Sequence, residues 1–135
     1  MNPRYPEVAA RAAHRCEYCQ APEAIFNFPF EVEHIIPPLA GGSDQLSNLA
    51  LACRGCNLFK ADRIEGLDPD GGQLVRLFNP RTDQWNEHFR LELATESLIG
   101  LTSQGRATIH QLRMNRPVQI AARRAWMRLG IYPPE

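Results

Sequence analysis

Apolar and polar positions along the chain define short elements separated by glycine and proline. Pro6 suits the first turn of a helix, and the Ala-rich segment after it predicts a helix that ends at about His14. Alternating apolar residues predict a strand over 26–36, in which Pro29 marks a sheet edge. The first part of the chain thus combines a helix with an edge strand.

Beyond this strand the apolar segments become shorter. Pro37 and Pro38 end the strand, and Gly41-Gly42-Ser43-Asp44 predicts a loop. A second strand is predicted over 49–52, and a short helix over 54–62. The predicted order is therefore strand, loop, strand, helix.

A turn cluster at 67–72 separates this unit from the rest of the chain. The remaining predicted elements are strands over 73–78, 85–93 and 98–101, and helices over 106–114 and 117–129. Thr102 and Ser103 are suited to cap the first of these helices. The apolar residues that we assign to the core are Trp85, Phe89, Ile99, Leu101, Ile109, Leu112 and Trp126.

The length of 135 residues is sufficient for one domain with a moderate core. We expect a single α+β domain over 1–135, with a core motif at 15–62 and an accessory region at 73–135. In this arrangement, C-terminal strands and Arg-rich helices pack on the N-terminal unit.

The four cysteines form two C-x2-C pairs, Cys16 with Cys19 and Cys53 with Cys56. Both sulfurs of such a pair can reach one tetrahedral ion, and two pairs supply all four ligands of a closed structural zinc site. A thioredoxin-like redox pair and a secreted disulfide framework are the alternatives. No cysteine is left over, which favours Zn2+.

The opening residues contain no apolar segment typical of a signal peptide, and no apolar run is long enough to cross a bilayer. We therefore expect a cytoplasmic protein without a membrane partner. In a reducing compartment, paired cysteines favour metal over disulfides.

Positive charge is distributed unevenly, although the net charge is zero. After Glu96 no acidic residue occurs before Glu135, whereas arginines accumulate there, and Lys60 is the only lysine. The planar guanidinium suits bidentate contact with phosphate. The C-terminal stretch is therefore either a phosphate-binding surface or a solvated helix face with carboxylate partners.

The segment between the cysteine pairs holds a candidate for general-base chemistry. His34 follows Glu33 directly, and Asn48 and Asn57 add amide oxygens. An imidazole with an ordinary pKa of about 6.5 can accept a proton from water near neutral pH. Carboxylate and amide oxygens are ligands suited to Mg2+ or Mn2+.

These residues follow one another as Glu33-His34-Ile35-Ile36-Pro37, Gly41-Gly42, Asn48, Cys53-x2-Cys56-Asn57 and Lys60. In this order and spacing the segment resembles the HNH endonucleases, in particular the zinc-containing ββα-metal type related to phage Holliday-junction resolvases. The resemblance covers under half of the chain. It implies metal-dependent hydrolysis of a nucleic-acid phosphodiester bond, with DNA as the expected substrate.

The resemblance also implies a role for each motif residue. His34 would be the general base, and Glu33 and Asn57 would hold the catalytic ion. Asn48 would orient the loop that presents the histidine. Lys60, three positions after Asn57, could meet a backbone phosphate. The arginines expected to bind nucleic acid are Arg106, Arg113, Arg123 and Arg124.

Each role has a structural alternative. Glu33 could be an exposed strand carboxylate, Asn57 a helix cap, and His34 a structural histidine. In a regular strand Glu33 and His34 face opposite sides, so joint action on one phosphate requires the strand to end, twist or bulge there. At the level of function, the alternatives are a noncatalytic zinc module that binds nucleic acid or protein, and a redox protein. The sequence predicts no oligomeric state.

Overall fold

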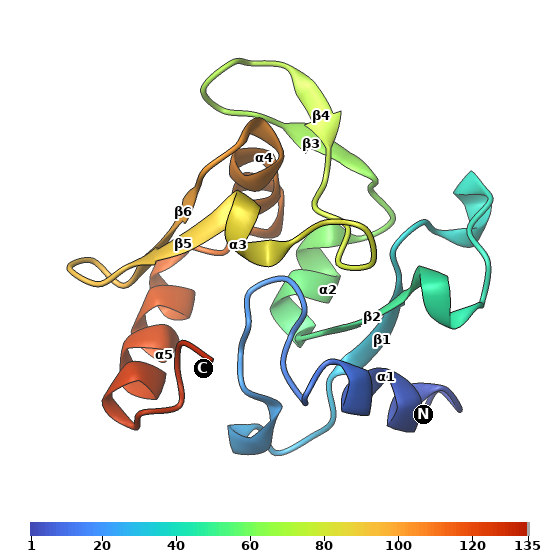
Figure 1. Ribbon diagram of the computed structural model, residues 1–135, viewed down its shortest axis with the longest axis horizontal. Coiled ribbons are helices and arrows are strands. Elements are labelled where there is room, and N and C mark those ends of the chain that lie inside the picture. Colours follow the sequence, from blue (N-terminus) through green and yellow to red (C-terminus); the bar gives the residue numbers. More distant parts are fainter. Residues whose placement is uncertain (135) are drawn as a thin grey trace.

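The computed structural model describes residues 1–134, which form an α+β structure as predicted (Figure 1). The helices are α1 (Tyr5–Arg11), α2 (Arg54–Lys60), α3 (Trp85–His88), α4 (Ser103–Leu112) and α5 (Pro117–Arg128), with short 3-10 turns at Glu23–Ile25, Pro38–Ala40 and Leu46–Asn48. The strands are β1 (Glu31–His34), β2 (Leu49–Ala52), β3 (Glu65–Leu67), β4 (Leu74–Arg76), β5 (Phe89–Glu92) and β6 (Ser97–Gly100). They pair as three antiparallel hairpins, β1–β2, β3–β4 and β5–β6.

The β1–β2 hairpin and helix α2 follow one another in the chain and pack together, as the order strand, loop, strand, helix predicted. In the hairpin register His34 lies opposite Leu49, and Glu33 lies opposite Ala50. Cys53 caps α2, because its sulfur accepts a hydrogen bond from the Cys56 N–H. Helix α2 lies between this hairpin and α4 (Figure 1).

One hydrophobic cluster connects the N-terminal and C-terminal regions. It includes Val8 of α1, all of β2, Phe89 of β5 and Leu112 of α4. Thr102 caps α4 by accepting the Gly105 N–H, at 3.0 Å. The C-terminal elements therefore pack against the unit that carries the cysteines.

The strand predicted over 26–36 is wrong at both ends, because only Glu31–His34 pairs with β2. Pro29 has no N–H to donate to a strand ladder, and the Phe30 N–H donates to the Glu23 carboxylate instead, at 2.7 Å. The rings of Phe26 and Phe30 pack edge to face with centroids 4.8 Å apart. The alternating pattern here reflects an aromatic cluster, not strand pairing.

Two other strand predictions also needed correction. Trp85–His88 forms one helical turn, and only the second half of the predicted strand, Phe89–Glu92, is extended. Trp-Asn-Glu-His contains no β-branched residue that would favour a strand. The strand predicted over 73–78 is confirmed only at Leu74–Arg76, and its partner Glu65–Leu67 is too short to have shown a pattern.

Among the residues assigned to the core, Leu101 is wrong, because its side chain is exposed. Its N–H donates to the His88 carbonyl at 2.8 Å, just before the Thr102 cap. The other six are buried or partly buried. No helix within residues 1–134 is both long and apolar enough to cross a membrane.

Candidate functional site

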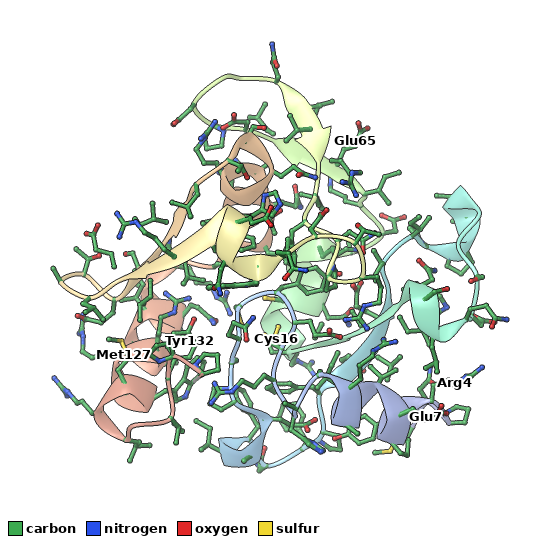
Figure 2. All side chains as sticks on the ribbon, in the orientation of Figure 1. Arg4, Glu7, Cys16, Glu65, Met127 and Tyr132 are labelled. Carbon is green, nitrogen blue, oxygen red and sulfur yellow. The ribbon has the colours of Figure 1, made fainter. Side chains whose placement is uncertain are left out.

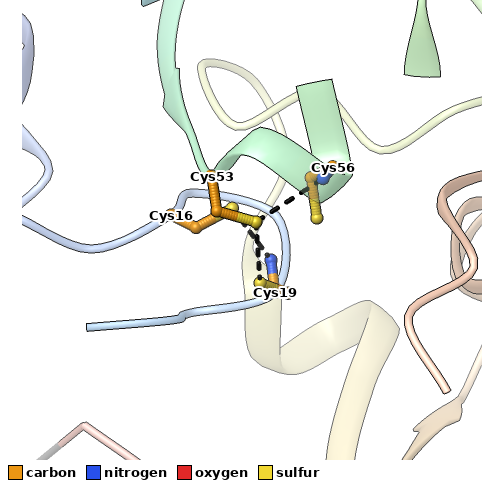
Figure 3. Close-up of side chains that lie close together, drawn as sticks. All are labelled: Cys16, Cys19, Cys53 and Cys56. Carbon is orange, nitrogen blue, oxygen red and sulfur yellow. Dashed lines mark hydrogen bonds between the residues drawn. The ribbon is translucent and has the colours of Figure 1, made fainter. Parts of the chain in front are cut away.

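The four cysteines meet although they come from two distant segments. Cys16 and Cys19 lie in the turns after α1, Cys53 caps α2, and Cys56 lies in its first turn. All four are buried, none forms a disulfide, and their sulfur atoms lie within 4.8 Å of one another (Figure 3). The cluster thus has the donor set of a closed metal site.

The spacing of the sulfurs fits Zn2+. A tetrahedral site with Zn–S bonds of about 2.3 Å places its sulfurs about 3.8 Å apart, and the Cys19 and Cys53 sulfurs are 3.7 Å apart. Hydrogen bonds from the Cys16 thiol and the other two thiols lower the pKa of Cys53. The N–H groups of Cys19 and Cys56 point at the sulfurs of Cys16 and Cys53. Four cysteine ligands would leave a zinc ion no position for substrate, so the cluster is compatible with a structural zinc site.

The C-terminal region surrounds the first cysteine pair. Gln119 of α5 donates to the Cys19 sulfur at 3.5 Å, and the Tyr132 hydroxyl donates to the Cys19 carbonyl at 2.8 Å. Figure 2 shows Tyr132 beside the loop that carries Cys16. The Trp85 indole donates to the Tyr18 carbonyl, also at 2.8 Å. Residues far away in the sequence therefore hold the metal-binding turn in place.

His34 is the last residue of β1 and pairs with an aspartate from the following loop. Its Nε2 lies 2.6 Å from Oδ1 of Asp44, and the His34 side chain is 27% exposed. The Asp44 side chain is 92% exposed. The strand ends here, so His34 faces the loop and solvent while Glu33 faces the interior.

Asn48 ties this loop to the end of β1. Its Oδ1 accepts the Ile36 N–H at 2.9 Å, and its Nδ2 donates to the carbonyls of Ile36 (2.9 Å) and Ser43 (2.8 Å). A Cβ at Gly42 would lie 1.6 Å from the Ile36 oxygen, so only glycine fits there. This is the geometry of an amide that orients a loop.

Glu33 is buried, and both of its carboxylate oxygens have partners. The Tyr18 hydroxyl donates to Oε1, and Nζ of Lys60 lies 3.1 Å from Oε2. Burial raises the pKa of Glu33, although Lys60 and Tyr18 oppose the rise. Binding of a metal ion through Glu33 would require this pair to open.

Lys60 is not a surface residue, so a direct contact with phosphate is ruled out in this conformation. Its side chain is 2% exposed, and Nζ also donates to the carbonyls of His34 (3.3 Å) and Ile35 (3.0 Å). These bonds fasten the end of α2 to the end of β1. Lys60 therefore holds the backbone of the residues that carry the candidate base.

Asn57 lies on α2 and is partly exposed, and its side chain forms no hydrogen bond within residues 1–134. Lys60 lies three positions later, so the two side chains are neighbours on the surface of the helix. Among the described residues, the cysteines are the only group of three or more His, Cys, Asp or Glu ligands that lie close together. The described residues thus contain no assembled carboxylate cluster for the second, catalytic ion that the sequence predicts.

Three of the four arginines expected to bind nucleic acid are engaged elsewhere. Arg106 forms a bidentate pair with Asp68, at 3.0 and 2.9 Å, and this pair lowers the pKa of Asp68. Arg124 pairs with Glu96 at 2.6 Å. Arg123 is fully buried and donates to the carbonyls of Glu96 and Met114, both at 2.8 Å. For Arg123 the prediction of a nucleic-acid contact is wrong, because its guanidinium does not reach solvent.

Arg113 alone among the four remains exposed and unpaired with a carboxylate within residues 1–134. Its guanidinium carbon lies 4.6 Å from the centroid of the Phe59 ring on α2.

The structure adds residues that the sequence did not single out. Asp44 was assigned only to a loop, because a loop aspartate gives no sign of which side chain it meets. Tyr18 and Gln119 also contact the site. Of these, only Tyr18 carried a signal, since it lies inside the first C-x2-C pair.

Comparisons with known proteins agree with this geometry. Residues 16–63 match the family model described as HNH endonuclease. Neither the curated proteins nor the solved structures yielded a match to the chain. The matched segment contains both cysteine pairs, His34, Asn48 and Asn57, and indicates nuclease-type activity or nucleic-acid binding.

Proposed function

Because residues 16–63 carry an HNH domain, we propose that the protein is a metal-dependent endonuclease that hydrolyses phosphodiester bonds, with DNA as its substrate. The observation that carries the proposal is the His34–Asp44 pair, held by the Asn48 amide at the end of β1. Structural zinc at the four cysteines would clamp this hairpin against α2.

In the proposed reaction His34 removes a proton from the attacking water. With Nε2 protonated and donating to Asp44, the lone pair of Nδ1 is the acceptor. The Asp44 carboxylate fixes the ring orientation and stabilises the imidazolium that forms. Asn48 acts on geometry and takes no part in proton transfer.

Bound Mg2+ or Mn2+ would supply positive charge beside the nonbridging and leaving oxygens of the phosphate. Asn57 is the proposed amide ligand, since its side chain is partly exposed and forms no hydrogen bond within the described chain. Glu33 is the proposed carboxylate ligand, and it can bind the ion only when Lys60 releases Oε2 of Glu33.

A noncatalytic module that binds nucleic acid is the second candidate. The engagement of Glu33 by Lys60 and Tyr18 favours it, because this carboxylate is closed to a metal ion in the present conformation. The two candidates differ in one measurable property, the dependence of DNA cleavage on His34 and on added metal ion.

The test is nicking of supercoiled plasmid by purified protein with Mg2+ or Mn2+. His34→Ala should reduce the rate by about 10²- to 10⁴-fold, the usual contribution of a general base. Asn57→Ala should raise the metal concentration needed for half-maximal rate. His110→Ala is the matched control, because His110 is an exposed histidine on α4 outside the matched segment.

Zinc content and thermal unfolding would be measured for every variant, so that loss of the fold is not mistaken for loss of chemistry. Plasmid left equally intact by wild type and His34→Ala, across metal ions and DNA forms, would contradict the nuclease. Retention of DNA binding in that case would support the noncatalytic module.

A further inference from the structure

Three arginines at the ends of α2, α4 and α5 have no carboxylate partner within residues 1–134. Arg54 begins α2, Arg113 is the cap residue that follows α4, and Arg116 precedes α5. The ion pairs of Arg106 and Arg124 use Asp68, Asp70 and Glu96. From residue 97 to residue 134 the chain contains no Asp or Glu, so α4 and α5 offer these arginines no internal counter-charge.

Phe59 of α2 brings two of these guanidiniums together. The guanidinium carbons of Arg113 and Arg116 lie 4.6 and 5.0 Å from the centroid of its ring. Cation–π attraction to one ring offsets the repulsion between the two positive charges. The arginines are thus held in place without being neutralised.

Gly55 gives Arg116 its position against α2. A Cβ at Gly55 would lie 2.5 Å from Nη2 of Arg116, so any larger residue would displace the guanidinium. Nη1 of Arg116 donates to the Arg113 carbonyl at 3.0 Å. The turn between α4 and α5 is therefore docked on the second C-x2-C pair.

The helical repeat connects this cluster to Asn57. At 100° per residue, Asn57, Arg54 and Leu58 follow one another around α2, and Gly55 and Phe59 come next. Arg54 and Leu58 are exposed. A continuous outer face of α2 therefore runs from the candidate metal ligand to the arginines over Phe59.

We propose that Arg54, Arg113 and Arg116 form a binding surface for the phosphate backbone of duplex DNA, which crosses the outer face of α2. This inference rests on the proposed function and names how its substrate is held. Guanidiniums without carboxylate partners suit phosphate oxygens, and backbone contacts position a duplex without selecting its sequence. The location of the surface on the helix that carries Asn57 favours nucleic acid over an acidic protein or an anionic membrane.

Binding is best measured on His34→Ala protein, because cleavage does not then consume the DNA. Anisotropy of a labelled duplex of arbitrary sequence gives the dissociation constant at several salt concentrations. The test variant carries Arg113→Gln and Arg116→Gln. The matched control carries Arg90→Gln and Arg128→Gln, which remove the same charge from exposed arginines on β5 and at the end of α5.

We expect the test variant to bind duplex DNA roughly tenfold more weakly, and its log–log salt slope to fall by about 1.8, since each lost phosphate contact removes about 0.9. Arg54→Gln should lower the slope by about half as much. The control should change both quantities far less. In the active protein, the test substitutions should raise KM and leave kcat nearly unchanged, because they remove uniform binding.

The inference is overturned by an unchanged affinity and slope in the test variant, or by an equal loss in the control. Competition by polyglutamate as effective as that by duplex DNA also overturns it. In each case His34-dependent plasmid nicking would remain to support the proposed function. If the wild type showed no His34-dependent nicking but its DNA binding still depended on the arginines, the nuclease would be contradicted and the binding surface would be supported.

Discussion

Residues 16–63 and residues 97–128 each contain a sequence pattern that suggests a function. The two regions differ in how the fold arranges their charged and metal-binding side chains. In the first region, cysteines at fixed spacing converge on one site, and the side chains of His34 and Asn48 both contact the loop that follows β1. In the second, two of the four arginines pair with carboxylates, one is buried against backbone carbonyls, and one lies over an aromatic ring.

The difference comes from what each pattern constrains. A C-x2-C pair fixes the distance between two sulfurs, so its geometry follows from its spacing. A run of arginines fixes only the charge, and the fold decides whether each guanidinium meets carbonyls, a carboxylate, a ring or water. Arg123 and Arg124 are neighbours in the chain, yet one is fully buried and the other pairs with Glu96 near the surface.

Removal of the metal from the first region should change the stability of the protein most. Chelation of zinc, or Cys56→Ser, should unfold the hairpin and α2, because structural zinc contributes about 10–16 kcal/mol in zinc-finger peptides. Circular dichroism and zinc content would follow the change, and added Zn2+ should restore the wild type but not Cys56→Ser. A protein that kept its melting transition without zinc would show that the shared core alone carries the fold.

The buried Lys60–Glu33 pair should give the next largest effect. Lys60→Met leaves the Glu33 charge buried without its partner, and loss of one partner of such a pair costs about 3–5 kcal/mol. The double variant Lys60→Met with Glu33→Gln should be less destabilised than the single one. Urea denaturation of the zinc-loaded proteins measures both.

Glu33→Gln alone distinguishes the two roles considered for this residue. A metal ligand would lose nicking activity at unchanged zinc content, with partial rescue by higher Mn2+ concentration. A purely structural carboxylate would lose stability without any change in metal dependence. If Lys60→Met, Glu33→Gln and the double variant were all as stable as the wild type, the argument that this pair fastens α2 to β1 would be contradicted.

Adjacent arginines provide a smaller and more direct contrast. Arg123→Met leaves the carbonyls of Glu96 and Met114 without their donor, and unsatisfied buried groups cost about 1–3 kcal/mol each. Arg124→Met breaks a partly exposed ion pair, worth about 0–1 kcal/mol. The same substitution at neighbouring positions should thus give clearly different urea midpoints. A larger cost at Arg124 would contradict the burial argument.

The sequence was sufficient for the parts of the site that depend on local spacing. It predicted the cysteine cluster, the order of β1, β2 and α2, and the helices α4 and α5 to within a few residues. It did not predict the partners of Glu33 and Lys60, because the ion pair joins residues from a strand and a helix whose packing no local pattern encodes. It also did not predict the contact between Asp44 and His34, because the conformation of the loop determines that contact.

Acid should weaken the first region through a carboxyl group with no part in the proposed chemistry. Glu23 is buried and accepts hydrogen bonds from the Phe30 N–H and the Tyr5 hydroxyl, both at 2.7 Å, and it pairs with His14. Burial alone would raise the pKa of Glu23, but these partners outweigh it and bring the pKa below its ordinary value of 4.5. A lowered pKa in the folded state means that the carboxylate stabilises the fold above that value.

This contribution should disappear as the pH falls through the folded-state pKa of Glu23. The free energy of unfolding should therefore decline more steeply on acidification in the wild type than in Glu23→Gln, when urea denaturation is followed from about pH 6 to about pH 3. Acid also protonates the cysteine ligands, but both proteins share that loss, so their difference isolates Glu23. Glu7→Gln is the control, since Glu7 is an exposed carboxylate on α1 whose pair with Arg4 is 3.5 Å long. Parallel curves for the wild type and Glu23→Gln would contradict the lowered pKa, and would leave zinc release as the source of acid sensitivity in this region.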